Sequence, residues 1–428
     1  MQNKNDHPSV RPDTAVLTRG FDPALSVGSA RPAVFRSSTY VFSSPETAER
    51  AFDIQGGRAR AEPGEHVDLI YSRFNHPNAE ILEDQIVPLE KDAQAAAVFN
   101  SGMAAIMTAI LAFAKPGDHI VYTVPLYGGT QHFIHDFLKP FGITGAAVMA
   151  GDGEALVRAI QQESNVRLVL VETPANPTLV MTDIRQAVEA SATCRPRPLV
   201  MVDNTFLGPA FQHPLELGAD IVLYSATKYL GGFSDLLGGF AIAADAPLIK
   251  KIKSKRALFG NILQPDECWI LDSRLPTVPL RMNRASKNAQ RIAEHLAGSP
   301  QIRKIYYPSL FEDAGQIRIR QAQCDYPGAI ISLDLAGGKA AAFEFLRNLR
   351  LARNAVSLGG VETLVCHPKS TTHSSVSAEE LRISGVTDGL VRISIGIEHW
   401  KDLLADFRAA LDAIPAGTDL QPPNEGGI

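Results

Sequence analysis

The chain is 428 residues long and has few cysteines, no excess of basic charge and no long apolar run. Its four cysteines, Cys194, Cys268, Cys324 and Cys366, are widely separated and form no CxxC pair. This scatter argues against a disulfide framework or a zinc site and indicates reduced thiols in a cytoplasmic protein. The eleven histidines include no HExxH motif, so no metal is expected. No apolar stretch is long enough to cross a membrane, and the N-terminal segment lacks the apolar core of a secretory signal.

The charge balance excludes further classes of partner. The formal net charge is −5 and no long basic block exists, so neither a nucleic acid nor a membrane surface is expected to bind. Nucleotide-binding motifs are missing as well, because there is no GxxxxGK[ST] sequence and the GxG that begins at Gly151 lacks its third glycine. A chain of this length still has room for several domains around a large core.

Three regions differ in their sequence pattern. Residues 1–75 are rich in proline, glycine, arginine and serine, and we expect them to form an arm that contacts a neighbouring subunit. A disordered tail is the alternative for residues 1–13. Residues 76–280 alternate short apolar runs with helical stretches, and residues 281–428 carry a second, smaller set of strands and helices.

The alternation in residues 76–280 predicts parallel strands with helices on both faces, because strands buried on both sides are apolar throughout. The runs that fit such strands are AAAVFN, HIVYTVP, RLVLVETP, PLVMVDN and DIVLYSAT. Helices between them are expected at SGMAAIMTAILAF and GEALVRAIQQES. The C-terminal region adds the strands IRKIYYP, GAIISLDL and LVRISIGIE and the amphipathic helices AAAFEFLRNL and HWKDLLADFRAALDAI. We therefore predict an α/β fold with a large, mostly parallel sheet domain and a smaller C-terminal α+β domain.

Polar residues stand at the ends of these predicted strands. Ligands of open α/β sheets bind at the carboxyl ends of strands, so we expect the following residues to converge: Asn100–Gly102, Glu172, Asp203–Asn204 and Ser225–Lys228. Ser101 and Gly102 open a helix whose free backbone N–H groups suit a phosphate, with a plain N-cap as the alternative. The hydroxyl groups of Ser225 and Thr227 at a neighbouring strand end favour the phosphate.

Lys228 stands alone among small, hydroxyl and glycine residues in the stretch SATKYLGG. Partial burial at this position would lower its pKa and expose a nucleophilic amine. Asp203 ends a buried strand, where a carboxylate needs a cationic partner such as a protonated pyridine nitrogen; a carboxylate that caps a loop is the alternative. A phosphate site, a lysine able to form a Schiff base and a buried carboxylate together indicate pyridoxal phosphate chemistry.

From Arg36 to Leu411, the motifs together resemble the Cys/Met-metabolism family of pyridoxal-phosphate (PLP) enzymes, which includes cystathionine γ-synthases, methionine γ-lyases and O-acetylhomoserine sulfhydrylases. The motifs are YSRFNHPN, SGM, LYGGT, ETPANPTL, VDNTF, SATK, VSLGG and RISIGIE. The resemblance implies pyridoxal 5'-phosphate as the cofactor and the fold type I, aspartate-aminotransferase-like architecture. It also implies a homodimer with shared active sites, commonly paired into a homotetramer.

The resemblance further implies a role for each matching position. In YSRFNHPN, Tyr71 and Arg73 would contact the cofactor phosphate of the neighbouring subunit, while His76 and Asn78 replace the usual asparagine and threonine. The other cofactor-binding positions are Gly102, Met103, Ser225 and Thr227 at the phosphate, Tyr127, Asn176, Asp203 and Thr205 around the ring, and Lys228 at the covalent bond.

The expected substrate-binding positions are Ser357, Arg392 and Val356. A guanidinium at Arg392 would hold the substrate α-carboxylate, whereas without the resemblance a solvated residue on a polar strand face would be the better interpretation. Val356 stands where cystathionine-handling members carry a glutamate, and Gly129 stands where methionine γ-lyases carry a cysteine. Phe233 replaces a common histidine. We expect substrate choice to depend on Gly129, Phe233 and Val356.

The function implied is γ-elimination from a homoserine- or methionine-type amino acid with a Cγ–S or Cγ–O bond, including oxygen-linked analogues such as canavanine. Lys228 would move protons, and Tyr127 would act as acid or base at the leaving group. γ-Replacement, as in an O-acylhomoserine sulfhydrylase or a cystathionine γ-synthase, is the close alternative. An aminotransferase on the same fold and a non-catalytic cofactor-binding protein are less favoured.

Overall fold

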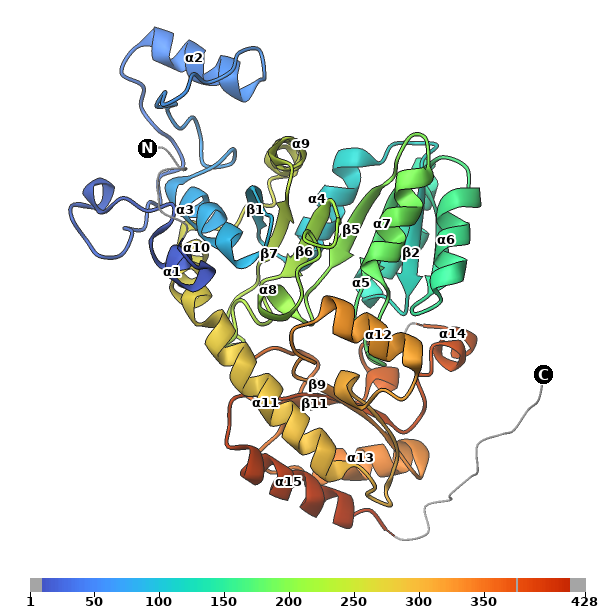
Figure 1. The fold of residues 1–428 in the computed structure, drawn as a ribbon. Helices are drawn as coiled ribbons and strands as arrows, with labels where there is room; N and C mark the ends of the chain where they lie inside the picture. The colour runs from blue at the N-terminus through green and yellow to red at the C-terminus, as the bar shows by residue number, and fades with distance from the viewer. Residues whose placement is uncertain (1–9, 375, 416–428) are drawn as a thin grey trace.

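Two sheets joined by the long helix α11 (Val278–Leu296) dominate the chain (Figure 1). The computed structural model describes residues 10–374 and 376–415. Within these residues a seven-stranded sheet occupies the first part of the chain and a five-stranded sheet occupies the last part. Every helix in the same residues is too short or too polar to span a bilayer.

The large sheet has the strand order β1-β7-β6-β5-β4-β2-β3. Neighbouring strands from β6 to β3 pair in parallel, whereas β7 runs antiparallel to both β1 and β6. The strands are β1 (Ala95–Phe99), β2 (His119–Val124), β3 (Thr144–Met149), β4 (Val166–Glu172), β5 (Leu199–Asp203), β6 (Ile221–Ser225) and β7 (Gly239–Ala243). All five strands predicted in this region are confirmed, while β3 and β7 were not predicted.

Strand β4 shows why the central strands are apolar throughout. Its side chains alternate between the two faces of the sheet: Leu168 and Leu170 pack with one layer of helices, and Val169 and Val171 pack with the other. The first layer includes α4 (Gly102–Phe113) and α9 (Ala246–Phe259), and the second includes α6 (Gly153–Gln162) and α7 (Ile184–Thr193). The predicted sheet with helices on both faces is therefore confirmed.

The small sheet has the order β10-β11-β12-β9-β8. Its strands are β8 (Ile302–Tyr306), β9 (Ile330–Leu335), β10 (Arg353–Asn354), β11 (Leu364–Cys366) and β12 (Leu390–Ser394), and its helices are α12 (Ala314–Gln323), α13 (Gly338–Asn348), α14 (Ala378–Ile383) and α15 (Trp400–Asp412). Val391 and Ile393 of β12 face the core formed with α11, α13 and α15. The opposite face looks toward the large sheet, because Ser332 of β9 donates a hydrogen bond to the carbonyl oxygen of Pro177.

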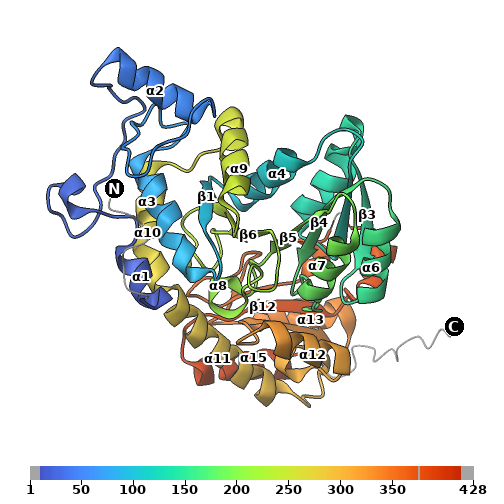
Figure 2. The same cartoon turned by 45° about the horizontal axis from the view of Figure 1, so that its top comes forward.

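Part of the N-terminal segment extends away from both sheets, whereas Val16 near its start is buried in one core cluster with side chains of β1 and β6. Its helices are α1 (Pro12–Thr18) and α2 (Pro45–Gln55), and α2 projects from the rest of the chain in both views (Figures 1 and 2). The following helix α3 (Pro77–Ile86) packs on α10 (Pro265–Arg274) beside β1. The shorter helices α5 (Gly128–His132) and α8 (Gly208–Phe211) follow β2 and β5. The proposed domain boundaries near residues 75 and 280 stay predictions.

Candidate active site

A pocket of about 210 Å³ opens at the carboxyl ends of β4, β5 and β6, where the small sheet faces the large one. Its lining brings together residues from the sheet ends and from the C-terminal region. They are Ser101, Gly102, Met103, Ile106, Tyr127, Glu172, Asn176, Asp203, Thr205, Phe206, Ser225, Thr227, Lys228, Leu237, Val356, Leu358, Thr372 and Arg392.

One side of the pocket is the N-terminus of α4. The Ser101 hydroxyl caps the helix by accepting from the backbone N–H of Ala104 at 3.1 Å. The backbone N–H groups of Gly102 and Met103 have no acceptor among the described residues. A side chain at position 102 would place its Cβ 2.8 Å from the Cβ of Ser225, so the close approach of helix and strand requires glycine. This corner offers free donors and a positive helix end to an anion.

Asp203 lies at the end of β5 with only one of its carboxylate oxygens engaged. Oδ1 accepts from the Thr205 backbone N–H at 3.0 Å and from the Thr205 hydroxyl at 2.6 Å. Oδ2 has no hydrogen-bond partner within the part of the chain that the structure describes. Burial raises the pKa of Asp203. A buried carboxylate with a free oxygen is suited to a cationic group in the pocket.

The amine of Lys228 is partly buried and donates to the Ser357 hydroxyl at 3.0 Å. Burial and, to a smaller extent, the nearby Arg392 guanidinium lower the pKa of Lys228 to about 8. Among the described residues no carboxylate forms an ion pair with this amine. The neutral, nucleophilic fraction of Lys228 near neutral pH is therefore far larger than that of a lysine with the ordinary pKa.

Arg392 lies on β12 and is 2% exposed, so the alternative of a solvated residue on a polar strand face is wrong. Its Nη1 donates to the side-chain oxygen of Asn176 at 3.0 Å. Its Nη2 donates to the backbone oxygens of Val356 at 2.7 Å and Ser357 at 3.2 Å. Its Nε is buried and has no partner within the described residues. An unpaired donor on a buried cation in the pocket wall fits an incoming carboxylate.

Tyr71 and Arg73 do not line the pocket of their own subunit. Tyr71 is 40% exposed, and the Arg73 guanidinium lies 5.1 Å from the centre of the Phe74 ring and donates to the carbonyl oxygen of Ala257. Their proposed contact with the neighbouring subunit stays a prediction.

His76 and Asn78, the two departures in the same segment, both have structural roles. Nδ1 of His76 caps α3 by accepting from the Ala79 backbone N–H at 3.2 Å, and its Nε2 lies 2.9 Å from the Leu263 carbonyl oxygen. The Asn78 side chain binds the backbone at residues 33 and 35. Histidine and asparagine therefore anchor the segment that carries Tyr71 and Arg73.

Two sequence expectations about this pocket were wrong. Asn204 is fully buried and donates to the Tyr224 hydroxyl at 2.9 Å, so it supports the sheet instead of facing the pocket. Asn100 is exposed and lies outside the lining. Phe233 is not part of the lining either, and the guanidinium groups of Arg274 and Arg281 lie 4.7 and 5.7 Å from its ring centre. Its expected effect on substrate choice stays a prediction.

No sequence motif marks a loop of the C-terminal region that closes the pocket. Thr372 is part of the lining, and the buried His373 places Nε2 3.2 Å from the carbonyl oxygen of Asn176. This loop meets the pocket only through tertiary contact and carries no local motif. Glu172 was placed at a strand end by the sequence but received no role, although it also lines the pocket.

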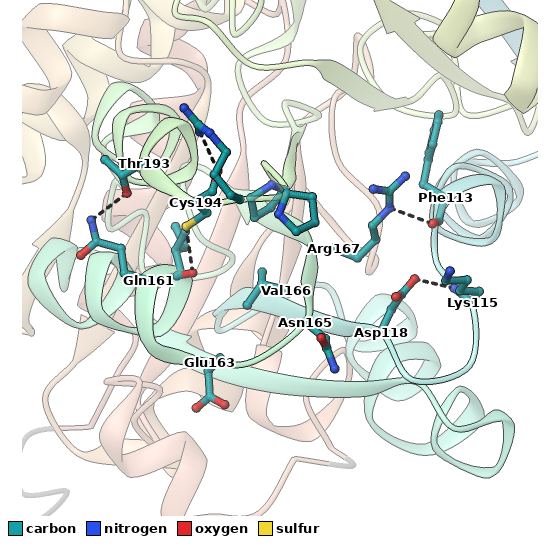
Figure 3. Close-up of a pocket in the computed structure, with 14 residues that line it drawn as sticks. Phe113, Lys115, Asp118, Gln161, Glu163, Asn165, Val166, Arg167, Thr193 and Cys194 are labelled. Carbon is teal, nitrogen blue, oxygen red and sulfur yellow. Dashed lines mark hydrogen bonds between the residues drawn. The ribbon is translucent and has the colours of Figure 1, made fainter.

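A larger cavity of about 680 Å³ lies on the opposite edge of the large sheet (Figure 3). It is lined by the start of β4 and the ends of α4, α6 and α7. Several of the polar groups drawn there bind one another or the backbone: Gln161 donates to Thr193, and Arg167 donates to the carbonyl oxygen of Phe113. The reactive constellation lies at the other edge, where ligands of parallel sheets bind.

The comparisons with known proteins agree with this site. The sequence profile described as Cys/Met metabolism PLP-dependent enzyme matches residues 13–412. An L-methionine gamma-lyase of Fusobacterium nucleatum is 39% identical over 383 residues, covering 89% of this chain and 93% of that protein. A cystathionine beta-lyase of Bacillus subtilis is 40% identical over 346 residues, covering 80% of this chain and 86% of that protein.

Solved structures give the same result for the fold. The cystathionine gamma synthase from Xanthomonas oryzae pv. oryzae, in complex with cystathionine, aligns with a TM-score of 0.86 at 34% identity. The alignment covers 95% of this chain and 99% of that one. The chain belongs to the Cys/Met-metabolism family, has the fold type I architecture and is a PLP-dependent enzyme that acts on amino acids.

The lowered pKa of Lys228 predicts the pH at which the cofactor-free protein reacts rapidly with PLP. The neutral amine is the nucleophile, so covalent uptake of PLP should speed up as the pH rises through about 8 and then level off. Stopped-flow absorbance at a series of pH values measures this midpoint. In Arg392→Gln the midpoint should move upward, because one cause of the shift is removed. A wild-type midpoint near 10.5, the ordinary lysine value, would contradict the assignment.

Proposed function

We propose that this member of the Cys/Met-metabolism family catalyses γ-elimination from a homoserine- or methionine-type amino acid, breaking a Cγ–S or Cγ–O bond. One observation carries the proposal: a lysine amine of lowered pKa and a buried guanidinium with an unpaired Nε share a single pocket. The guanidinium suits the α-carboxylate of an amino acid, and the amine suits removal of a proton from its α-carbon.

The residues around the pocket fit PLP by their chemistry. The free N–H groups at the start of α4 and the hydroxyl groups at the end of β6 suit its phosphate, and the free oxygen of Asp203 suits its ring nitrogen. When bound, PLP supplies an electron sink that stabilises negative charge on the substrate. The positions that we propose for cofactor binding are Gly102, Met103, Tyr127, Asn176, Asp203, Thr205, Ser225, Thr227 and Lys228, with Tyr71 and Arg73 from a neighbouring subunit.

The chain's own groups account for binding and proton transfer. Arg392 holds the substrate carboxylate on the β12 side of the pocket, and the Asn176 side chain keeps the guanidinium in place. The Lys228 amine takes the proton from the α-carbon and returns protons at the later steps, while the Ser357 hydroxyl orients the amine. Tyr127 is 46% exposed at the mouth of the pocket, where its hydroxyl can protonate a leaving group.

The outer wall of the pocket favours a short, uncharged substituent at the γ-carbon. It is formed by apolar side chains, and Val356 is 54% exposed where cystathionine-handling members carry a glutamate. At Gly129, a Cβ would lie 2.9 Å from Cε1 of Tyr127 and 3.0 Å from Sδ of Met103. Glycine therefore lets the Tyr127 ring and the Met103 thioether occupy space that a cysteine would need.

γ-Replacement is the second candidate, because cystathionine gamma synthases are among the structures that align over 95% of the chain. Elimination is favoured because several relatives that cover most of the chain are named L-methionine gamma-lyase. Both reactions need the Arg392 guanidinium to hold the substrate carboxylate and the Lys228 amine to transfer protons. They differ in the last stage, where either a nucleophile adds to the γ-carbon or water releases the oxo acid.

A substrate panel tests the choice. The panel is methionine, canavanine, cystathionine, and O-acetyl- and O-succinylhomoserine with and without sulfide, with oxo acid and new amino acid measured together. We expect oxo acid and ammonia from a substrate with an uncharged γ-substituent, and Val356→Glu should raise kcat/KM for cystathionine relative to the other substrates. A new amino acid formed faster than oxo acid would favour replacement. Oxo-acid formation that stops after one turnover would indicate an aminotransferase.

We propose that the active site is shared between two copies of the chain. The N-terminal segment exposes apolar side chains that a single subunit leaves uncovered, including Leu25, Val27 and Val41. The same segment leads into Tyr71 and Arg73, which lie outside their own pocket. A second copy seated on this segment would cover the apolar groups and bring the two side chains to its own cofactor site.

Subunit mixing tests the shared site. Lys228→Ala and Arg73→Ala should each be nearly inactive alone. Denaturing and renaturing them together should restore about a quarter of wild-type activity, because half of the dimers are mixed and each mixed dimer has one intact site. Mixing Lys228→Ala with itself is the control. Size-exclusion chromatography and tagged pull-down should show that mixed dimers have formed. If mixed dimers are present but no activity is recovered, the sharing of residues between subunits is contradicted.

A further inference from the structure

Glu172 is a buried carboxylate that holds two backbone segments of the pocket. It ends β4, is 5% exposed and forms no ion pair among the described residues. Its Oε2 accepts from the Tyr127 backbone N–H at 2.8 Å, and its Oε1 accepts from the Asn176 backbone N–H at 3.3 Å. Its own N–H donates to the Thr123 hydroxyl at 3.1 Å. The carboxylate therefore joins two loops to the end of one rigid strand.

Both loops carry residues with proposed roles at the cofactor. Tyr127 stands immediately before α5, and its ring is 46% exposed. Asn176 follows β4 and touches Arg392 through its side chain and His373 through its carbonyl oxygen. The position of Glu172 thus affects the ring-stacking tyrosine, the asparagine near the ring and, through the asparagine, the carboxylate-binding guanidinium.

We propose that Glu172 is a positioning residue of the active site, which sets the orientation of Tyr127 and Asn176 against the cofactor ring through its two carboxylate oxygens. The inference rests on the proposed roles of those two residues and goes beyond the proposed reaction, because it does not depend on the leaving group. A glutamine amide cannot replace this carboxylate. Its NH₂ group is a donor and would face the backbone N–H of either Tyr127 or Asn176, which is also a donor.

The charges near Glu172 connect its two hydrogen bonds to cofactor binding. Glu172 pairs in register with Asp203 on β5, and burial together with the Asp203 charge raises the pKa of Glu172 above its ordinary value. The Arg392 guanidinium and the two N–H donors oppose this rise. A cation that neutralises Asp203 would weaken the repulsion, favour the ionised carboxylate and so tighten both hydrogen bonds.

The decisive variant is Glu172→Gln, and Asp406→Asn is its matched control. Asp406 is also a buried carboxylate that accepts only from backbone N–H groups, at Arg350, Leu351 and Ala352, but it lies on α15 outside the pocket. The measurements are thermal unfolding without cofactor, the Kd of added PLP, the visible circular dichroism of bound PLP and the kcat and KM of the preferred substrate.

Both variants should unfold at lower temperature, because each leaves a buried donor unsatisfied. Only Glu172→Gln should weaken PLP binding by about ten-fold and alter the dichroic band, because only this variant turns Tyr127 and Asn176. Its kcat should fall more than its KM changes. Asp406→Asn should keep the wild-type Kd and band.

A Glu172→Gln protein with wild-type PLP affinity and dichroic band would overturn the proposal. If this variant does not fold, Thr123→Val is the substitute, because it removes the hydroxyl that accepts from the Glu172 backbone N–H. It should shift the Kd of PLP and the dichroic band in the same direction by a smaller amount. A folded Thr123→Val protein without any shift would then overturn it. Because PLP binding and dichroism need no substrate, an error in the proposed reaction would leave these results unaffected.

Discussion

The amine of Lys228 is partly buried near a second cation, the Arg392 guanidinium, and the rest of the site is arranged around that constraint. An ion pair between the Lys228 amine and either pocket carboxylate, Asp203 or Glu172, would have raised the pKa of the amine. The amine would then have been protonated and no longer nucleophilic. Asp203 and Glu172 are instead bound by hydroxyl and backbone donors. Among the described residues, the Lys228 amine forms its one hydrogen bond with the neutral Ser357 hydroxyl. The guanidinium of Arg392 then lowers the lysine pKa while remaining available to a carboxylate.

The parallel register of the large sheet provides this separation of charges. Glu172 and Asp203 stand side by side at the ends of β4 and β5, and Ser225 ends the next strand. The small sheet supplies the cation from the other side through the face of β12 that looks toward the large sheet. The carboxylates thus come from one sheet and the guanidinium proposed to bind the substrate comes from the other, so the contact between the sheets completes the pocket.

Much of this arrangement was predictable from sequence, because it follows from strand order and strand ends. Continuous apolar runs identified the central strands, and the polar residues after them identified Asp203, Ser225 and Lys228 as neighbours. Strands β3 and β7 were not predicted: β3 is an edge strand with partly exposed residues, and β7 is a short run bounded by glycine whose burial comes from pairing with β1 and β6. Local patterns contain neither feature.

Tertiary contacts explain the remaining differences. The burial of Arg392 depends on the opposing sheet, and the placement of Thr372 and His373 depends on a loop far away in the chain. Asn204 directly follows Asp203 after β5, but its side chain turns into a buried network with Tyr224. The strand-end rule therefore identified the right edge without identifying the direction of each side chain.

The central claim is that Lys228 is the amine that binds the cofactor. Reduction of the PLP-loaded protein with borohydride, followed by digestion and peptide mass spectrometry, tests it directly. The cofactor mass should appear on Lys228 and on no other lysine. A stable label on a different lysine, with Lys228 unmodified, would contradict it.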